Sequence, residues 1–405
     1  MLIQKGYKYR IYPTAAQKEM IAQTLGCCRF VFNHFLDMRS TEYKENKKSL
    51  SYNKTAGLMA LMKKEQETEW LKNADSMALQ EALRNLDTAF QNFFHKTGRY
   101  PRFKSKHHNT QSYRTRNQSN GIRFEENSRL LLPKLGKVKI KKHRDFNGRI
   151  LNATVTKTAS GRYYVSLCVE QDFVPKTNTG GSVGIDVGLK EFYTDSNGSV
   201  LKNPKPLAKL MKKLVREQRK LSRKIKGSSN RQKQRVKVAR IHERITNTRK
   251  DFLHKASSKI VSENQVIAVE QLNVKGMIHN RRLAKAIADA SWSEFVRQLE
   301  YKAFEHGGTV IKVPTFYPSS QTCSCCGYLN RDVRNLAVRQ WDCPVCGKHH
   351  DRDKNAAVNI LWHAMEINDM KSDTPGHGEI YACGESIRPE ASSQAILVET
   401  RSPRL

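Results

Sequence analysis

Four cysteines, arranged as two Cys-x-x-Cys pairs, constrain the fold of this chain more than any other feature of its sequence. Cys323 and Cys326 lie in TCSCCG, and Cys343 and Cys346 lie in DCPVCG. This spacing lets two thiolates bind one ion from a tight turn, and the sixteen residues between the pairs suit a zinc ribbon. Four thiolates complete a tetrahedral shell and leave no open position. The sequence therefore predicts one structural zinc site.

The neighbouring thiol and histidines are weaker candidates for this site. Cys325 could replace one of its neighbours, but its spacing is less suitable. His349 and His350 could also be ligands, yet four cysteines already suffice, so both are expected to lie in a loop or to contact nucleic acid. In a reducing compartment, the nine cysteines indicate metal binding plus incidental thiols rather than disulfides.

The balance of charge indicates a polyanionic partner. Lys and Arg number 72 against 38 Asp and Glu, so the formal net charge is +34. Self-repulsion on this scale is relieved when nucleic acid neutralises the basic side chains. The plainer alternative is a soluble basic protein without such a partner. Because no run of about 18 apolar residues and no apolar signal core is present, the chain is expected to stay inside the cell and to bind no membrane.

Three carboxylates occupy positions where an acid is costly or functional. In SVGIDVG, Asp186 lies on the strand face opposite Ile185, and in VIAVEQL, Glu270 ends a second apolar strand. Asp351 opens the last helix. Each acid alone could pair with a Lys, and Asp351 could be a helix cap. All three together predict a catalytic site. Asp353 is a weaker candidate, expected to cap the helix or to position a neighbour.

Such a carboxylate set suits magnesium. Hard oxygen ligands are those that Mg²⁺ prefers, and the ion keeps several of its waters. Two ions held by Asp186, Glu270 and Asp351 would activate a water for in-line attack on a phosphodiester and would stabilise the leaving 3′ oxygen. No side-chain nucleophile is then required.

Hydrophobic periodicity divides the chain into strand and helix segments. Strands are expected at residues 1–13, across 121–171, near 183–187, at 264–272 and at 307–314. Helices are expected near 15–38, 53–65, 74–96 and 281–306, and a last, Ala-rich helix opened by Asp351 is expected to run to about Met370. Residues 202–255 carry 20 Lys or Arg against three acids on two apolar stripes, which predicts a basic helical hairpin. Residues 97–118 interleave aromatics with cations, a pattern that can stack on bases, although a solvated basic loop is the alternative.

The motifs together resemble the TnpB family of transposon-encoded RNA-guided nucleases, which is related to the miniature type V CRISPR effectors. The resemblance is carried by GIDVGLKEF, VIAVEQLNVKGM, SSQTCSCCG with WDCPVCG, DRDKNAAVNIL, YKYRIYPTAAQKEMI, CRFVFNHFL and GRYPRFKSK. These motifs span residues 1 to 365 in the family's order. By matching motifs, the resemblance gives Asp186, Glu270 and Asp351 the catalytic, magnesium-binding positions.

The resemblance implies an α/β multidomain fold. Its parts are an RNase H-like (RuvC) nuclease core with an inserted zinc ribbon, and a β-barrel wedge domain with an inserted helical recognition domain. The expected boundaries are 1–14 and 118–175 for the wedge, 15–117 for the recognition domain, 176–320 and 349–370 for the nuclease core with its basic hairpin at 203–260, 321–348 for the ribbon, and 371–405 for a flexible tail.

The resemblance also implies an activity and its partners. These are Mg-dependent cleavage of double-stranded DNA beside a short adjacent motif, directed by a guide RNA derived from the transposon end, with one protein per RNA. The expected location is the cytoplasm of a prokaryote, in association with the nucleoid. The alternative is a guide-RNA-dependent repressor or transposition regulator that does not cleave. A DNA-strand transposase is disfavoured because no Tyr lies in a recognisable His-containing nucleophile motif.

Overall fold

The structure, a computed structural model, describes residues 1–108, 110–176 and 180–372. The chain divides into two units, with Phe173 ending the first and Val174 beginning the second. Of the tail predicted at 371–405, residues 373–405 lie outside the described part of the chain. Among the helices of the described ranges, none is both long and apolar enough to cross a membrane.

The first unit is a seven-stranded antiparallel sheet with helices inserted after its first strand. The strand order is β2-β6-β7-β1-β5-β4-β3. Its elements in chain order are β1 (Leu2–Tyr12), α1 (Ala15–Asn46), α2 (Tyr52–Met62), the 3-10 helix η1 (Glu69–Asn73), α3 (Ser76–Phe94), β2 (Gln111–Arg116), β3 (Arg123–Glu125), β4 (Arg129–Leu132), β5 (Gly136–Lys141), β6 (Arg149–Lys157) and β7 (Tyr163–Asp172).

Strand β1, the first strand of this unit, pairs with β7, its last strand. Its alternating residues Tyr7, Tyr9 and Ile11 are buried in the sheet core, as the period of two in the sequence predicts. Helix α1 then begins at a capping box, in which Thr14 accepts from the Gln17 backbone and the Gln17 side chain accepts from the Thr14 backbone. The strand–helix boundary is therefore fixed by local hydrogen bonds.

The second unit contains a five-stranded mixed sheet of order β10-β9-β8-β11-β12. Strands β8, β11 and β12 are parallel, and β9 and β10 are antiparallel to their neighbours. Its elements are β8 (Gly181–Val187), β9 (Glu191–Asp195), β10 (Val200–Lys202), α4 (Lys205–Ser222), α5 (Ser229–Glu263), β11 (Asn264–Glu270), α6 (Val274–Met277), α7 (Ala284–Ala290), α8 (Trp292–Glu305), β12 (Thr309–Val313), the 3-10 helix η2 (Arg331–Arg334), β13 (Gln340–Asp342), β14 (His349–Asp351) and α9 (Arg352–Ser372).

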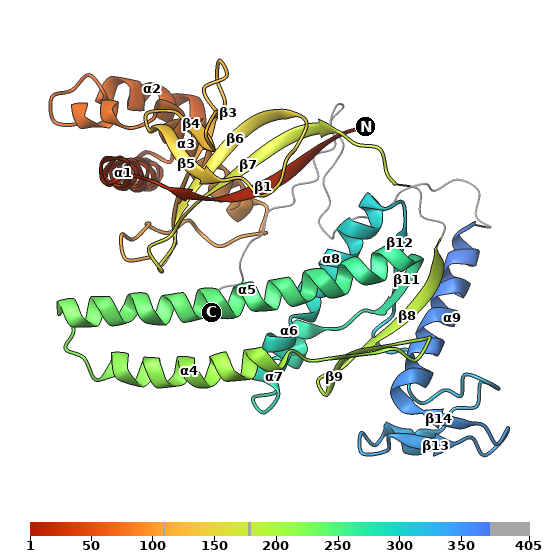
Figure 1. The fold of residues 1–405 in the computed structure, drawn as a ribbon. Helices are drawn as coiled ribbons and strands as arrows, with labels where there is room; N and C mark the ends of the chain where they lie inside the picture. Colours follow the sequence, from red (N-terminus) through yellow and green to blue (C-terminus); the bar gives the residue numbers. More distant parts are fainter. Residues whose placement is uncertain (109, 177–179, 373–405) are drawn as a thin grey trace. The chain divides into compact units, whose positions relative to one another are not determined.

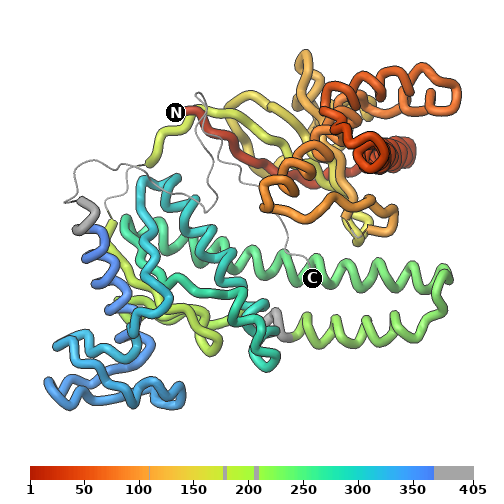
Figure 2. The backbone as a smooth tube through the Cα atoms, turned by 180° about the vertical axis from the view of Figure 1, so that it is seen from behind, coloured from red at the N-terminus to blue at the C-terminus, as the bar shows by residue number. Residues whose placement is uncertain are grey.

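The two faces of the mixed sheet are covered by different helices. Ile185 and Val269 pack with α5 and α8 in one core, which includes the fully buried Phe295. On the other face, Ala268 packs with Ile360 of α9. Figure 1 shows α9 beside β8, and both Figure 1 and Figure 2 show residues 321–348 beyond the N-terminal end of α9.

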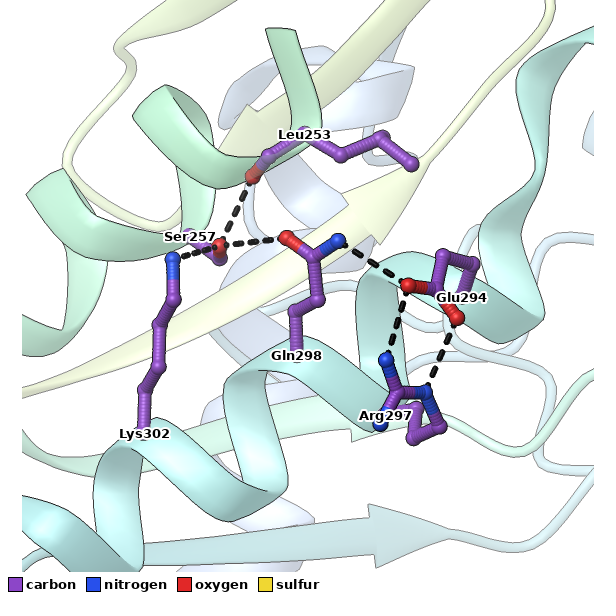
Figure 3. A network of polar contacts seen from close by, with 6 residues as sticks. All are labelled: Leu253, Ser257, Glu294, Arg297, Gln298 and Lys302. Atoms are coloured by element: carbon purple, nitrogen blue, oxygen red, sulfur yellow. Dashed lines mark hydrogen bonds and ion pairs between the residues drawn. The ribbon is translucent and has the colours of Figure 1, made fainter. Parts of the chain in front are cut away.

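A polar network joins α5 to α8 (Figure 3). The Ser257 hydroxyl lies 3.0 Å from Gln298 Oε1, and Lys302 Nζ donates to the same hydroxyl at 2.7 Å. Gln298 Nε2 donates to Glu294, which also accepts two hydrogen bonds of 2.9 Å from Arg297. Burial lowers the pKa of Lys302 to about 8. Because these partners are mutually satisfied within the helix interface, the network fixes α8 against α5.

The expected basic hairpin is present as α4 and α5 (Figure 1). Leu214 of α4 packs against Val238 and Ile241 of α5. The buried Gln234 side chain donates to Glu217 Oε2 at 2.9 Å, a polar contact across the same interface. The apolar stripe therefore holds the two helices together and leaves their basic residues on the outer faces.

The single helix expected at residues 281–306 is wrong. Two helices, α7 and α8, occupy this region, and Ser291 between them has a left-handed backbone with φ 56°. The break reorients the chain so that Ile287 of α7 and Trp292 of α8 both reach the same core. A continuous 3.6-residue period does not reveal such a break, because both segments keep apolar residues at helical spacing.

Candidate active site and metal centre

Strand register brings Asp186 and Glu270 side by side. In the parallel pair of β8 and β11, Ile185 is the Cα partner of Val269. Asp186 and Glu270 each follow this pair by one residue, so both side chains leave the sheet on the same face at the carboxyl ends of the strands. The sequence predicted both acids, and the pairing of the strands places them next to each other.

The acids lie on the face that α9 covers. Gly184 is two residues before Asp186 and therefore shares its face. A Cβ atom at Gly184 would lie 2.0 Å from the carbonyl oxygen of Ala357, so only glycine permits this approach of β8 to α9. Ala268, two residues before Glu270, packs against the same helix. The N-terminal part of α9 consequently lies near the two carboxylates.

Asp353, rather than Asp351, is the acid of this helix that interacts with Asp186. Asp186, Glu270 and Asp353 are partly buried, whereas Asp351 is exposed. Burial raises the pKa of Asp186 to about 8, with further increases from the charges of Asp353 and Glu270, while Arg352 and Arg339 oppose the rise. Burial also raises the pKa of Glu270. An anionic Asp186 is thus disfavoured unless a cation is supplied.

Asp351 has a different role in the structure. Its Oδ1 accepts hydrogen bonds from the backbone N–H groups of Asp353 and Lys354, at 3.1 and 3.0 Å, which is the N-cap geometry of α9. Strand β14 pairs Asp351 with Gln340. Asp351 is thus the N-cap of α9, the alternative that the sequence analysis left open for it and a role that it also offered to Asp353. The catalytic role expected of Asp351 stays a prediction.

The helical period of the apolar residues could have placed Asp353 on the sheet-facing side of α9. Asp353, Ala357, Ile360 and Ala364 are spaced i, i+4, i+7 and i+11, and the last three are buried. Asp353 therefore belongs to the face of α9 that packs on the sheet, whereas Asp351 precedes the helix. Arg339 belongs to the segment that carries the four cysteines, residues 321–348, called the cysteine segment below. It forms an ion pair with Asp353, with 3.3 Å between Nη1 and Oδ1.

The cysteine segment is tied to α9 by two buried asparagines. Asn355 and Asn359 both donate from Nδ2 to the carbonyl oxygen of Thr322, at 2.7 and 2.6 Å. The Asn355 side chain also accepts from the backbone N–H of Ser324 at 3.0 Å. Since Thr322 directly precedes Cys323, these bonds fix the first cysteine pair relative to the helix that carries Asp353.

The four predicted cysteines form a cluster. Cys323, Cys326, Cys343 and Cys346 have their Sγ atoms within 4.8 Å of one another, and they are the one such group of potential metal ligands found among the described residues. The Sγ atoms of Cys323 and Cys346 are 3.7 Å apart. Four sulfurs at the usual Zn–S distance would be roughly 3.8 Å apart in a tetrahedron. The cluster therefore fits a zinc ion, and Cys325 lies outside it.

His350 is a neighbour of this cluster that the sequence interpretation placed elsewhere. It is 5% exposed, packs against Trp341, and has its Nε2 atom 3.0 Å from Cys323 Sγ. In the tautomer that carries the proton on Nε2, His350 can donate to the Cys323 thiolate and stabilise it without being a ligand. His349, in contrast, is exposed and pairs with Asp342 at 2.7 Å. Both histidines were expected in a loop or in contact with nucleic acid, where a side chain is exposed. His349 is exposed, whereas His350 is buried.

Comparison with solved structures identifies the class of fold. The chain is similar to Cas12f1 in a cryo-EM structure of a Cas12f1–sgRNA–target DNA complex, with a TM-score of 0.56 and 14% sequence identity. The alignment covers 89% of this chain and 99% of the Cas12f1 chain. At this identity the likeness concerns the fold alone.

Family profiles match three parts of the chain. They are described as "Probable transposase" for residues 166–281, "Cas12f1-like, TNB domain" for residues 292–360 and "Helix-turn-helix domain" for residues 1–48. In residues 1–48, all of which the structure describes, the chain forms strand β1 and the single long helix α1. The last description therefore does not correspond to the conformation of this segment.

Two bacterial proteins match almost the whole chain. A protein of Streptomyces pristinaespiralis named "Putative RNA-guided DNA endonuclease" is 37% identical over 96% of this chain and 94% of its own length. "Putative RNA-guided DNA endonuclease InsQ" of Escherichia coli is 34% identical over 95% of each chain. "TnpB-like protein L79" of Acanthamoeba polyphaga mimivirus is 30% identical over 44% of this chain. The chain belongs to the TnpB family.

Proposed function

We propose that this chain is an RNA-guided double-stranded DNA endonuclease of a transposable element, directed by a guide RNA from the transposon end. The names of its two nearly full-length bacterial relatives support this activity. The observation that carries the proposal is the register of β8 and β11, which sets Asp186 beside Glu270 on the face covered by the Asp353 helix. Acids gathered at strand ends beside a basic surface suit cleavage of a phosphodiester.

The proposed nuclease core is the second unit, as a RuvC-like domain of RNase H-like fold. Its mixed sheet, with three parallel strands and helices on both faces, supports this assignment. The first unit is proposed to be the wedge domain, with α1 to α3 as the inserted recognition domain. The pairing of β1 with β7, across the inserted helices, supports that division.

Asp186, Glu270 and Asp353 are proposed to hold magnesium, with Asp353 in the role first given to Asp351. Burial of Asp186 and the neighbouring charges of Asp353 and Glu270, which together raise the pKa of Asp186, favour binding of a cation. Among the described residues, these acids are not grouped as tightly as the cysteines, which suits an ion that keeps several waters. When bound, Mg²⁺ supplies an activated water and stabilises the leaving oxygen. Asp186, Glu270 and Asp353 would hold the ions through their carboxylate oxygens.

The cysteine cluster is proposed to hold a structural zinc ion. A Cys₄ shell has no open position, so the cluster takes no direct part in the chemistry. Its function would be to stabilise residues 321–348, from which Thr322 and Arg339 contact α9. The zinc would thereby support the position of Asp353.

Guide RNA and target DNA are the proposed partners. The net charge of +34 and the basic outer faces of α4 and α5 support a nucleic-acid surface. In a guided system, base pairing reads most of the target and the protein reads only a short adjacent motif.

The test is cleavage of a target plasmid by protein co-expressed with RNA from the transposon end, in Mg²⁺. Asp186→Ala should abolish cleavage, because a shared metal ligand is lost, and should retain guided binding in a gel shift, because binding rests on base pairing and distant cations. Asp251→Ala is the matched control, since Asp251 is exposed and pairs with the exposed Lys255 one helical turn away, and it should cut normally. Equal cleavage by Asp186→Ala and the parent would contradict the proposal.

The second candidate is a guided repressor that binds without cutting. It would bind the same target in the gel shift, yet the parent protein would leave the plasmid intact. The presence of all the candidate acids disfavours it. Comparing binding and cleavage on one target therefore separates the two functions.

A further inference from the structure

Phe316 is the most exposed large apolar side chain of the described residues, at 96%. It lies in the segment 314–318 that follows β12. Leaving a phenyl ring in water forgoes the burial energy that most aromatic residues contribute. Single exposed apolar residues are common on protein surfaces, so exposure alone assigns no role to this one.

The backbone around Phe316 is held firmly. On one side, the Thr315 hydroxyl donates to the carbonyl oxygen of Gln271. On the other side, the Tyr317 ring stacks on His363 of α9, with centroids 4.2 Å apart and planes at 3°. The Tyr317 N–H donates to the Pro314 carbonyl oxygen at 3.1 Å. Both neighbours of Phe316 are thus anchored, so its ring is presented from a fixed backbone.

The anchors place Phe316 at the carboxylate edge of the sheet. Val313, the last residue of β12, is the Cα partner of Glu270 in the parallel pair with β11. Gln271, which binds Thr315, directly follows Glu270. The backbone at Phe316 therefore lies close to the end of β11, the strand that carries Glu270.

We propose that Phe316 stacks on a nucleobase of the DNA strand that crosses the carboxylates, and so holds that strand for cleavage. The inference rests on the proposed endonuclease function. A base offers a π-face that one aromatic ring can cover, whatever the sequence. A protein partner would need about 800 Å² of surface per side, far more than one ring provides. The large positive charge also favours a nucleic-acid occupant.

Cleavage kinetics give the first test, with full-length protein, guide RNA, target DNA and Mg²⁺ under single-turnover conditions. Phe316→Ala should lower the cleavage rate about tenfold or more, as loss of one base stack implies. Phe316→Trp should keep the parent rate, because Trp can stack. Phe316→Leu, which is apolar but cannot stack, should be as slow as Phe316→Ala. Val174→Ala is the control, because Val174 is 83% exposed at the start of the second unit. Thermal unfolding should not change in any of these variants.

Fluorescence gives a second test that does not depend on cleavage. In an Asp186→Ala background, 2-aminopurine placed at successive positions of the target strand should be quenched at one or two adjacent positions, and Phe316→Ala should remove that quenching. Guided binding by gel shift should stay the same. Parent-rate cleavage by Phe316→Ala or Phe316→Leu, or quenching that survives Phe316→Ala, overturns the inference. If the parent itself does not cut, the proposed function fails, and the fluorescence alone decides whether Phe316 stacks.

Discussion

Asp351 and Asp353 have different environments although only one residue separates them. Asp351 lies just before α9 and accepts hydrogen bonds from two backbone N–H groups. Its carboxylate thus pairs donors at the start of the helix that have no partner within the helix. Asp353 lies within the first turn, on the face that packs on the sheet, where its charge raises the pKa of Asp186. One acid is suited to stabilise the helix, and the other to bind a cation.

This difference predicts opposite effects of two alanine substitutions. Asp353→Ala should reduce cleavage roughly a hundredfold or more, because a metal ligand is lost, with little loss of stability. Asp351→Ala should lower the free energy of unfolding by about 1 kcal/mol, because the N-cap is lost, and should retain most cleavage. Plasmid cleavage and thermal unfolding measured on both variants check the assignment. If Asp351→Ala abolished cleavage while Asp353→Ala cut normally, Asp351 would be the catalytic acid, as the resemblance implies.

At the scale of elements, β8 and α9 approach each other closely at Gly184. A Cβ at Gly184 would also lie 2.8 Å from the backbone nitrogen of Leu361, in addition to its clash with Ala357. Backbone atoms cannot yield as a flexible side chain can, so any side chain at Gly184 must push the helix away from the strand. Because α9 carries Asp353, this displacement would also change the spacing of the carboxylates.

Gly184→Ala is therefore expected to reduce both stability and cleavage. We expect a loss of roughly 1–3 kcal/mol in the free energy of unfolding, the usual range for overpacking. Gly181→Ala, in the same strand, is the control, since Gly181 is exposed and has no atom within 4 Å of the added Cβ. Denaturant unfolding and cleavage rates should separate the two variants. A Gly184→Ala protein as stable as the parent would show that the helix can move without cost.

The sequence predicts the elements of the site better than their contacts. Alternation around Ile185 and the CxxC spacing report local geometry, so the first acid and the cysteine cluster can be identified without a structure. The break at Ser291 and the environment of His350 depend on tertiary packing, which periodicity does not encode. The choice between Asp351 and Asp353 depends on the residue at which α9 begins, and helix ends are the least certain feature of a sequence pattern.

At the scale of the whole molecule, charge is the dominant feature. The excess of 34 positive charges cannot be neutralised internally, because 72 Lys and Arg face only 38 Asp and Glu. Glu81 illustrates the imbalance, since it pairs with Arg84, Arg114 and Arg116. The surplus cations are free to bind phosphates, and each contact releases counterions. The behaviour of the protein in solution should therefore depend on its bound nucleic acid.

We expect the protein to co-purify with a structured RNA and to lose solubility when the RNA is removed. If six to ten phosphates are contacted, affinity should fall about 10³-fold or more between roughly 50 and 200 mM salt. Sequencing of the bound RNA and a salt titration of binding would check both points. A soluble, RNA-free preparation that cuts a specific DNA site, or an affinity that does not respond to salt, would contradict this expectation.

The central position of β1 in its sheet also has a consequence for synthesis. Tyr7 pairs with Leu167, and Leu2 with Asp172, so the first strand made can complete its pairing only after nearly all of the first unit has been translated. At 5–20 residues per second, the delay is on the order of 10–30 s. During this time α1 to α3 can form through local contacts, and β5 can pair with the end of β1, while the edge of β1 that pairs with β7 remains without a partner. A ribosome-bound chain stalled before residue 163 should therefore present this strand to chaperones, and one stalled well beyond residue 173 should not.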